Sequence, residues 1–133
     1  MMREQRRAAD AARLVQDAKD RLSRDEQLKF RSKALALPVM VRTNGLLQTV
    51  AFLEAQAGPS AGEGAHDRRL IDALLTQLTA AGFPRPRGLW SAALCDLGTT
   101  EYFRWQEEAV LCAAWIKRFT AALIEKPTTA GGR

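Results

Sequence analysis

Apolar residues recur every three or four positions over the last long segment of the chain, in steps of 3, 4, 3, 4, 3 and 4. An α-helix has about 3.6 residues per turn, so this spacing places all of these side chains on one face. It predicts a long C-terminal helix over residues 99–125, whose stripe Leu111 and Trp115 should widen. The stripe itself consists of Tyr102, Trp105, Ala109, Cys112, Ile116, Phe119 and Leu123.

The composition favours helices in the rest of the chain as well. Ala and Leu contribute 40 of the 133 residues, whereas Val and Ile contribute only 8. Ala and straight-chain residues lose little freedom in a helix, whereas β-branched residues favour strands. The length suits one domain. We therefore predict an all-α, single-domain compact bundle of about five to seven helices over residues 1–126, followed by a disordered tail over residues 127–133.

The spacing of small and apolar residues predicts two helices in the first third of the chain. An Ala-rich seam indicates the first over residues 3–22, and a second should run from about residue 24 to 37. Pro38 lacks a backbone N–H, so the second helix should break or kink there. Residues 39–43 would then form only a short turn, and Asn44 could cap the next helix.

Glycine and proline divide the middle of the chain. A helix apolar on nearly every side is expected over residues 46–57. Residues 58–65 contain three glycines, a proline and a serine and should form a surface loop. Asp67 is expected to cap the helix that follows, and Gly82 suits its C-terminal end. A short helix should occupy residues 89–97.

The chain lacks features of membrane, secreted or metal-binding proteins. Its longest apolar run, residues 109–116, is eight residues long, whereas a membrane span needs about 20. No apolar stretch follows the basic N-terminus, so we expect no signal peptide. Cys95 and Cys112 are too few for a disulfide scaffold or a zinc site. We expect a cytoplasmic protein without a metal or another cofactor.

No group of residues indicates catalysis. His66 is the single histidine, and we interpret it as an ordinary residue at the end of the Gly-rich loop. Glu107 and Glu108 point about 100° apart on a helix and cannot form a catalytic dyad. Glu108 should instead pair with Arg104, one turn earlier. The sequence therefore predicts a protein that is not an enzyme.

The charge of the chain permits a polyanionic partner without requiring one. The formal net charge is +5, and residues 1–33 carry ten basic and six acidic side chains. Scattered basic residues that only solvate a helical domain would give a similar balance. Most aromatic residues fall on helical stripes, which favours core packing over base stacking. Any contact with RNA or DNA should therefore be to phosphates, sensitive to salt and independent of base sequence.

Two stretches, in this order and separation, resemble a known family. The first runs from residue 37 to 53 and the second from residue 101 to 122. Together they resemble the small, fifth-named subunit of the type III-B (Cmr) CRISPR RNA-silencing complex, and the resemblance covers roughly residues 20–125. The matching runs are Leu37-Pro38, Arg42-Thr43-Asn44-Gly45-Leu46, Gln48-Thr49-Val50-Ala51-Phe52-Leu53, Glu101-Tyr102, Glu108-Ala109, Trp115-Ile116-Lys117-Arg118-Phe119 and Ala121-Ala122.

This resemblance implies an all-α, non-catalytic structural subunit that serves antiviral defence. In the family, copies stack beside the backbone subunits that hold the guide RNA and form a second, shorter filament. The filament of backbone subunits and this second filament enclose the channel where target RNA pairs with the guide. Target cleavage belongs to the backbone subunit. The implied partners are other subunits of the complex, guide RNA and target RNA, and further copies of this chain. No membrane partner is implied.

The segment after Tyr102 departs from the family pattern. A basic residue followed by small or hydroxyl residues is typical there, whereas this chain has Phe103, Trp105, Gln106 and Glu107. Tyr102 and Arg104 stay plausible RNA contacts, but the resemblance assigns no RNA role to residues 105–107.

We expect a set of exposed basic residues to face the RNA, because base pairing with the guide reads the sequence and the protein needs only to hold the backbone. The set is Lys29, Lys33, Arg42, Lys117 and Arg118. Arg42 could instead brace the Asn44-Gly45 bend, and Lys117 and Arg118 could simply be solvated.

Two other functions are possible alternatives. They are a protein–protein adaptor without RNA contact and a DNA-binding helical regulator, with a small hydrolase more distant.

Overall fold

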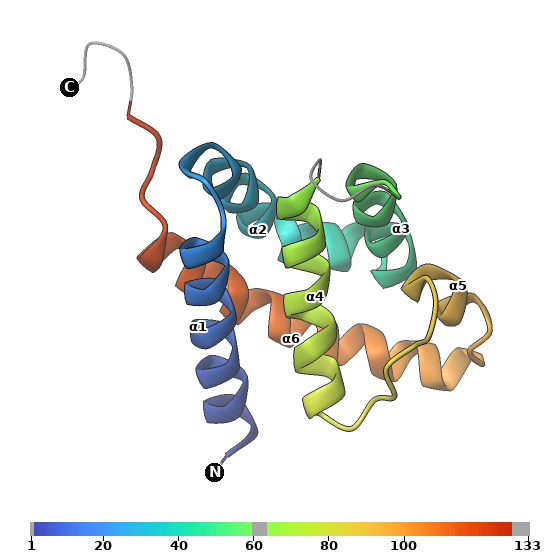
Figure 1. The fold of residues 1–133 in the computed structure, drawn as a ribbon. Helices are drawn as coiled ribbons and strands as arrows, with labels where there is room; N and C mark the ends of the chain where they lie inside the picture. Colours follow the sequence, from blue (N-terminus) through green and yellow to red (C-terminus); the bar gives the residue numbers. More distant parts are fainter. Residues whose placement is uncertain (1, 60–63, 129–133) are drawn as a thin grey trace.

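The computed structural model describes residues 2–59 and 64–128, and within these ranges it contains helices and no strands. This confirms the predicted all-α fold and its long C-terminal helix (Figure 1). Four residues of the predicted surface loop and five of the predicted tail lie outside the described residues. The helices are α1 (Arg3–Arg21), α2 (Arg24–Asn44), α3 (Leu46–Ala57), α4 (Ala65–Ala80), α5 (Trp90–Cys95) and α6 (Thr99–Leu123).

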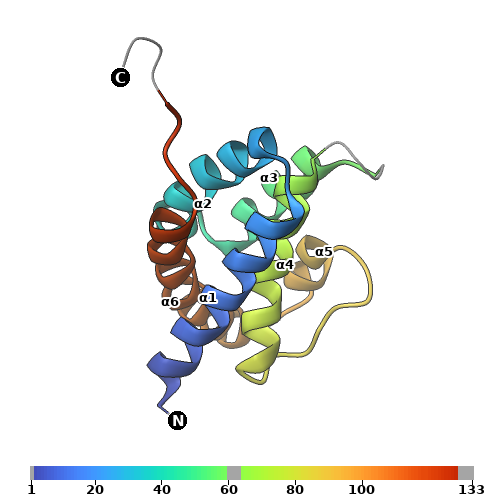
Figure 2. The same cartoon turned by 60° about the vertical axis from the view of Figure 1, so that its left-hand side comes forward.

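Helix α6 is the element on which the bundle is built. It packs against α1, α2 and α4, and Figure 2 shows α1 crossing over it. Gln106, near the start of α6, contacts Val41 near the end of α2. Arg31, near the start of α2, donates a hydrogen bond to the carbonyl of Ile124, just beyond α6. The two helices are therefore antiparallel.

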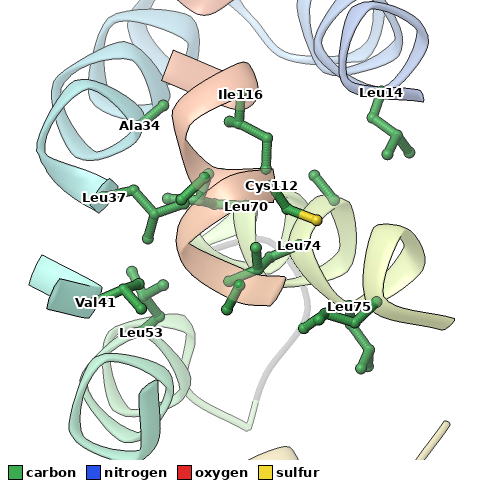
Figure 3. Packing of buried hydrophobic residues seen from close by; sticks show 14 of the residues in the cluster. Leu14, Ala34, Leu37, Val41, Leu53, Leu70, Leu74, Leu75, Cys112 and Ile116 are labelled. Carbon is green, nitrogen blue, oxygen red and sulfur yellow. The ribbon is translucent and has the colours of Figure 1, made fainter. Parts of the chain in front are cut away.

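The stripe on α6 forms much of the core. Its middle positions are fully buried, and Figure 3 shows Cys112 and Ile116 packed among side chains of α2 and α4, including Leu37 and Leu70. The residues at the two ends of the stripe are half-buried. The prediction that Leu111 widens the stripe is wrong, because its side chain is 47% exposed. It lies one residue, or about 100° of helix rotation, away from Cys112.

Of the predicted break or kink at Pro38, the break is wrong, because α2 continues through this residue to Asn44. Proline within a helix removes one hydrogen bond and costs about 3 kcal/mol. Buried residues continue at helical spacing on both sides of Pro38, so packing against α6 outweighs this local cost. They are Phe30, Ala34, Leu37 and Val41.

Two predicted helix caps are replaced by glycines. Helix α4 begins before Asp67, with Gly64 as its N-cap residue, and Asp67 lies buried in the first turn. Gly45, rather than Asn44, separates α2 from α3. The expectation for Gly82 is confirmed, since it follows α4 with a φ of 105° that favours glycine.

Helix α3 buries one face only, so its apolar composition does not place all of its sides in the core. Leu46, Val50 and Leu53 are buried, whereas Phe52 is 45% exposed. The Lys33 ammonium lies 5.8 Å from the centre of the Phe52 ring, which leaves this aromatic side chain beside a charged one at the surface.

Candidate functional site

Lys29 and Lys33 lie one turn apart on α2 and line an open pocket of about 390 Å³ beside the start of α4. Lys33 Nζ lies 2.5 Å from the Oδ1 atom of Asp67, whose side chain is only 2% exposed. This ion pair ties α2 to α4 and neutralises Lys33. Lys29 is half-exposed, and its ammonium lies 3.8 Å from the carboxylates of Asp25 and Glu26. Such exposed pairs are weak, so Lys29 can still attract an external anion.

His66 is not the loop residue that the sequence suggested, because it lies buried in the first turn of α4. Its Nδ1 is 2.7 Å from Glu26 Oε2, and its Nε2 is 3.1 Å from Asp67 Oδ2. Burial alone would raise the pKa of Glu26, but the hydrogen bonds and charge of His66 and the charge of Lys29 outweigh it, and the pKa is lowered. His66 thus joins α4 to α2 through the Glu26 carboxylate, and its other ring nitrogen contacts Asp67 of its own helix.

Arg42 lies exposed in the last turn of α2. No hydrogen bond or ion pair of this side chain occurs among residues 2–59 and 64–128, so it does not brace the following bend. Its guanidinium is therefore available to a partner. Arg42 is nine residues beyond Lys33 on the same helix, which corresponds to a separation of about 13 Å along the axis.

The bend between α2 and α3 is held by Tyr102 of α6. The backbone N–H of Leu47 donates a hydrogen bond to the Tyr102 hydroxyl oxygen over 2.9 Å. Gly45 at the corner has a φ of 87°, and a Cβ atom added there would lie 3.2 Å from the same hydroxyl oxygen. The corner therefore requires glycine, and the Tyr102 hydroxyl is used inside the protein.

Gln106 holds the other side of this bend. Its Oε1 accepts a hydrogen bond from the N–H of Leu46, and its Nε2 donates one to the carbonyl of Val41, both over 2.6 Å. The two stretches on which the family resemblance depends therefore meet at this corner. Gln106, at which the sequence departs from the family pattern, has a structural role here.

Lys117 and Arg118 are exposed on α6. The Arg118 guanidinium carbon lies 5.0 Å from the centre of the Trp115 ring, which orients this side chain by a cation–π contact. Of the five predicted residues, the structure brings together Lys29 and Lys33. It places Arg42 at the other end of α2 and the last two on a different helix.

Four arginines line a cavity of about 310 Å³ between α1 and α6, and of these only Arg104 was expected from the sequence to contact RNA. Three arginines within five residues of the chain, in its most basic third, were the available signal. Their partners from α6 could not be inferred, because they lie about a hundred residues away. The arginines are Arg3, Arg6, Arg7 and Arg104.

The predicted pair between Glu108 and Arg104 does not form. Glu108 accepts hydrogen bonds from Nε and Nη2 of Arg7, over 2.6 and 2.8 Å, whereas Arg104 pairs with Glu101 over 2.7 Å. Burial alone would raise the pKa of Glu108, but its hydrogen bonds with Arg7 and Cys112 and the charges of Arg7 and Arg6 outweigh it. The pKa of Glu108 is therefore lowered.

The cysteines differ from each other, since Cys112 is buried and Cys95 is exposed, and both are free.

The part of the chain that the structure describes contains no group of three or more His, Cys, Asp or Glu side chains able to hold a metal ion. None of its helices combines the length and the apolar character needed to cross a membrane.

Comparisons with known proteins agree on one family. The family described as CRISPR-associated protein (Cas_Cmr5) matches residues 3–123. A curated protein of Thermus thermophilus, "CRISPR system Cmr subunit Cmr5", is 37% identical over 98 residues, which cover 74% of this chain and 77% of that protein. The crystal structure of a CRISPR-associated Cmr5 family protein from the same organism has a TM-score of 0.74 and 30% identity, covering 94% of this chain and 100% of that one.

Proposed function

Because this chain belongs to the Cmr5 family of CRISPR-associated proteins, we propose that it is a non-catalytic structural subunit of a type III-B (Cmr) RNA-guided RNA-silencing complex. In this role it stacks beside the backbone subunits and further copies of itself, and it contacts guide or target RNA through phosphates for antiviral defence. The observation that carries the proposal is the family match over residues 3–123.

The fold supports a scaffold role. A rigid helical bundle can present basic side chains at fixed separations, which suffices to hold an RNA whose sequence is read by base pairing. The cluster around His66 and the bend at Gly45 use their polar side chains to join helices. These groups therefore have a structural explanation that needs no reaction.

Four of the five expected basic residues are suited to RNA contact. Lys29, Arg42, Lys117 and Arg118 are exposed. Lys33 contributes less, because its charge is paired with Asp67. The exposed four lie on α2 and α6, which are packed together and antiparallel.

Co-expression with the backbone subunits and guide RNA tests the assignment to a complex. We expect the chain to copurify with both. Failure to enter such a complex would contradict the proposed function.

Charge reversal tests the RNA contact. The variant K29E/R42E should bind single-stranded RNA more weakly than the wild type, with the slope of log affinity against log salt reduced by about 0.7 for each phosphate that is no longer neutralised. Lys33 is left intact, since a glutamate there would face Asp67. The matched control R13E/R21E reverses two exposed arginines of α1. Intact assembly with RNA affinity equal in both variants would favour a protein–protein adaptor, and preferential binding of duplex DNA would favour a regulator.

A further inference from the structure

The cavity between α1 and α6 collects arginines from two helices that are distant in sequence. Arg3, Arg6 and Arg7 come from the first two turns of α1, and Arg104 comes from the second turn of α6. Glu107 and Glu108 also line the cavity, so its lining carries a formal charge of +2.

The protein itself neutralises only part of this charge. The charge of Arg7 is paired with that of Glu108 through two hydrogen bonds, and both side chains are largely buried. Arg104 is paired with Glu101, and its guanidinium carbon lies 5.6 Å from the centre of the Phe83 ring. These contacts hold two of the guanidinium groups in fixed positions.

The other two arginines are poorly compensated. Arg6 Nη2 lies 3.9 Å from Glu108 Oε2, and the Nε atom of Arg6 is buried without a hydrogen-bond partner. Arg3 forms no hydrogen bond or ion pair with any residue that the structure describes. Arg3 and Arg6 therefore bring positive charge and unused hydrogen-bond donors to the cavity.

Without a bound anion, arginines at this position are unfavourable for the stability of α1. The N-terminus of a helix carries a partial positive charge, which repels cations and attracts anions. The first turn of α1 contains one acidic residue, Glu4, beside this basic cluster. An anion in the cavity would relieve the repulsion among the arginines and between them and the helix end.

We propose that this cavity binds a phosphate group. Guanidinium groups match phosphate oxygens in a planar, two-pronged geometry, and a phosphate can accept from several arginines on different sides. The single carboxylate that fits Arg7 is already supplied by Glu108. Leu111, 47% exposed at the same cavity, offers apolar surface to the sugar or base attached to the phosphate.

The inference rests on the proposed function for RNA as the source of the phosphate, whereas binding of inorganic phosphate does not depend on it. The test compares the variant R6Q/R104Q with R13Q/R21Q in the full-length chain. Both variants remove two positive charges, one from each of two arginines, but only the first alters the cavity. Arg7 stays in place, so the bridge to Glu108 is preserved.

The first measurement is a titration with inorganic phosphate, followed by NMR at the arginine Nε–H groups. We expect saturable shifts at Arg6 and Arg104 in the wild type and in R13Q/R21Q, with chloride at equal ionic strength giving none. The second is the affinity for single-stranded RNA with either a 5′-phosphate or a 5′-hydroxyl. R6Q/R104Q should weaken RNA binding about tenfold, as expected for the loss of charge-assisted hydrogen bonds, and the control about twofold at most.

A preference for the 5′-phosphate would identify a terminal phosphate as the ligand, and equal affinity would identify an internal phosphodiester. Absence of saturable shifts together with equal RNA affinity of the two variants would overturn the inference. Loss of assembly with unchanged RNA affinity would overturn it too, because an acidic protein group would then occupy the cavity. If K29E/R42E still weakens RNA binding in either case, the proposed function stands without this site.

Discussion

Arg7 of α1 forms a two-pronged ion pair with Glu108 of α6, although 101 residues separate them in the sequence. The two side chains are only 11% and 14% exposed. The thiol of Cys112, one turn further along α6, donates a third contact to the Glu108 carboxylate over 3.4 Å. This pair joins the first and last helices at the wall of the arginine cavity.

Removing the Glu108 charge should destabilise the fold. E108Q leaves the largely buried Arg7 without its counter-charge, and the free energy of unfolding should fall by about 2–3 kcal/mol, somewhat less than for a fully buried pair. Urea denaturation measures the change. E101Q, which breaks the exposed pair with Arg104, is the control and should change stability by only a few tenths of a kcal/mol. Equal effects of the two substitutions would contradict a special contribution of the bridge.

The same pair should make stability depend on pH. The pKa of Glu108 is lowered from its ordinary value of 4.5, so its stabilising contribution is complete above pH 4.5 and is lost as the pH falls through the lowered pKa. The midpoint temperature of thermal unfolding of the wild type should fall over this acidic range. The difference between the wild type and E108Q should shrink there, and a difference that stays constant down to pH 2 would disagree with this assignment.

The glycine at the α2–α3 corner should be intolerant of a side chain. G45A places a Cβ 3.2 Å from the Tyr102 hydroxyl oxygen at a φ of 87°, and the free energy of unfolding should fall by about 2 kcal/mol. G88A is the control, because no atom lies within 4 Å of a Cβ there and its φ is not positive. Chemical denaturation of both variants checks the contrast, which would be absent if the corner could relax.

Lys33 and Lys29 should differ in their contribution to stability despite lying one turn apart. K33M leaves the buried Asp67 carboxylate without its closest counter-charge and should cost about 2 kcal/mol or more. K29M removes only long, exposed contacts and should change stability very little. Thermal denaturation of the two variants at neutral pH compares them. A larger effect of K29M would refute the distinction.

The two cysteines should react at very different rates. The pKa of the Cys112 thiol is raised by burial and by the neighbouring Glu108 carboxylate, and the thiolate is the nucleophile. Iodoacetamide at pH 8 should therefore modify the exposed Cys95 in the folded protein and leave Cys112 unmodified. Mass spectrometry locates the label, and both sites should react in denaturant. Rapid labelling of Cys112 in the folded state would contradict its burial.

Several elements were predictable because their signals are local. The stripe from Trp105 to Ile116 identified the buried face of α6. Pro38 was misjudged because a local penalty was weighed without the packing of Val41 that follows it. The basic residues were identifiable as charges, but whether each was paired or free was not.

The amino-acid sequence by itself determined the helical class, the position of the long α6 helix and the family, since helix periodicity and motif runs are properties of neighbouring residues. Only the tertiary structure decided which charges are available to a partner. Lys33 is neutralised by Asp67, which lies 34 residues away, and Arg7 by Glu108 across 101 residues. Ion pairing depends on separation in space, and the packing of α1 and α4 against the other helices sets that separation.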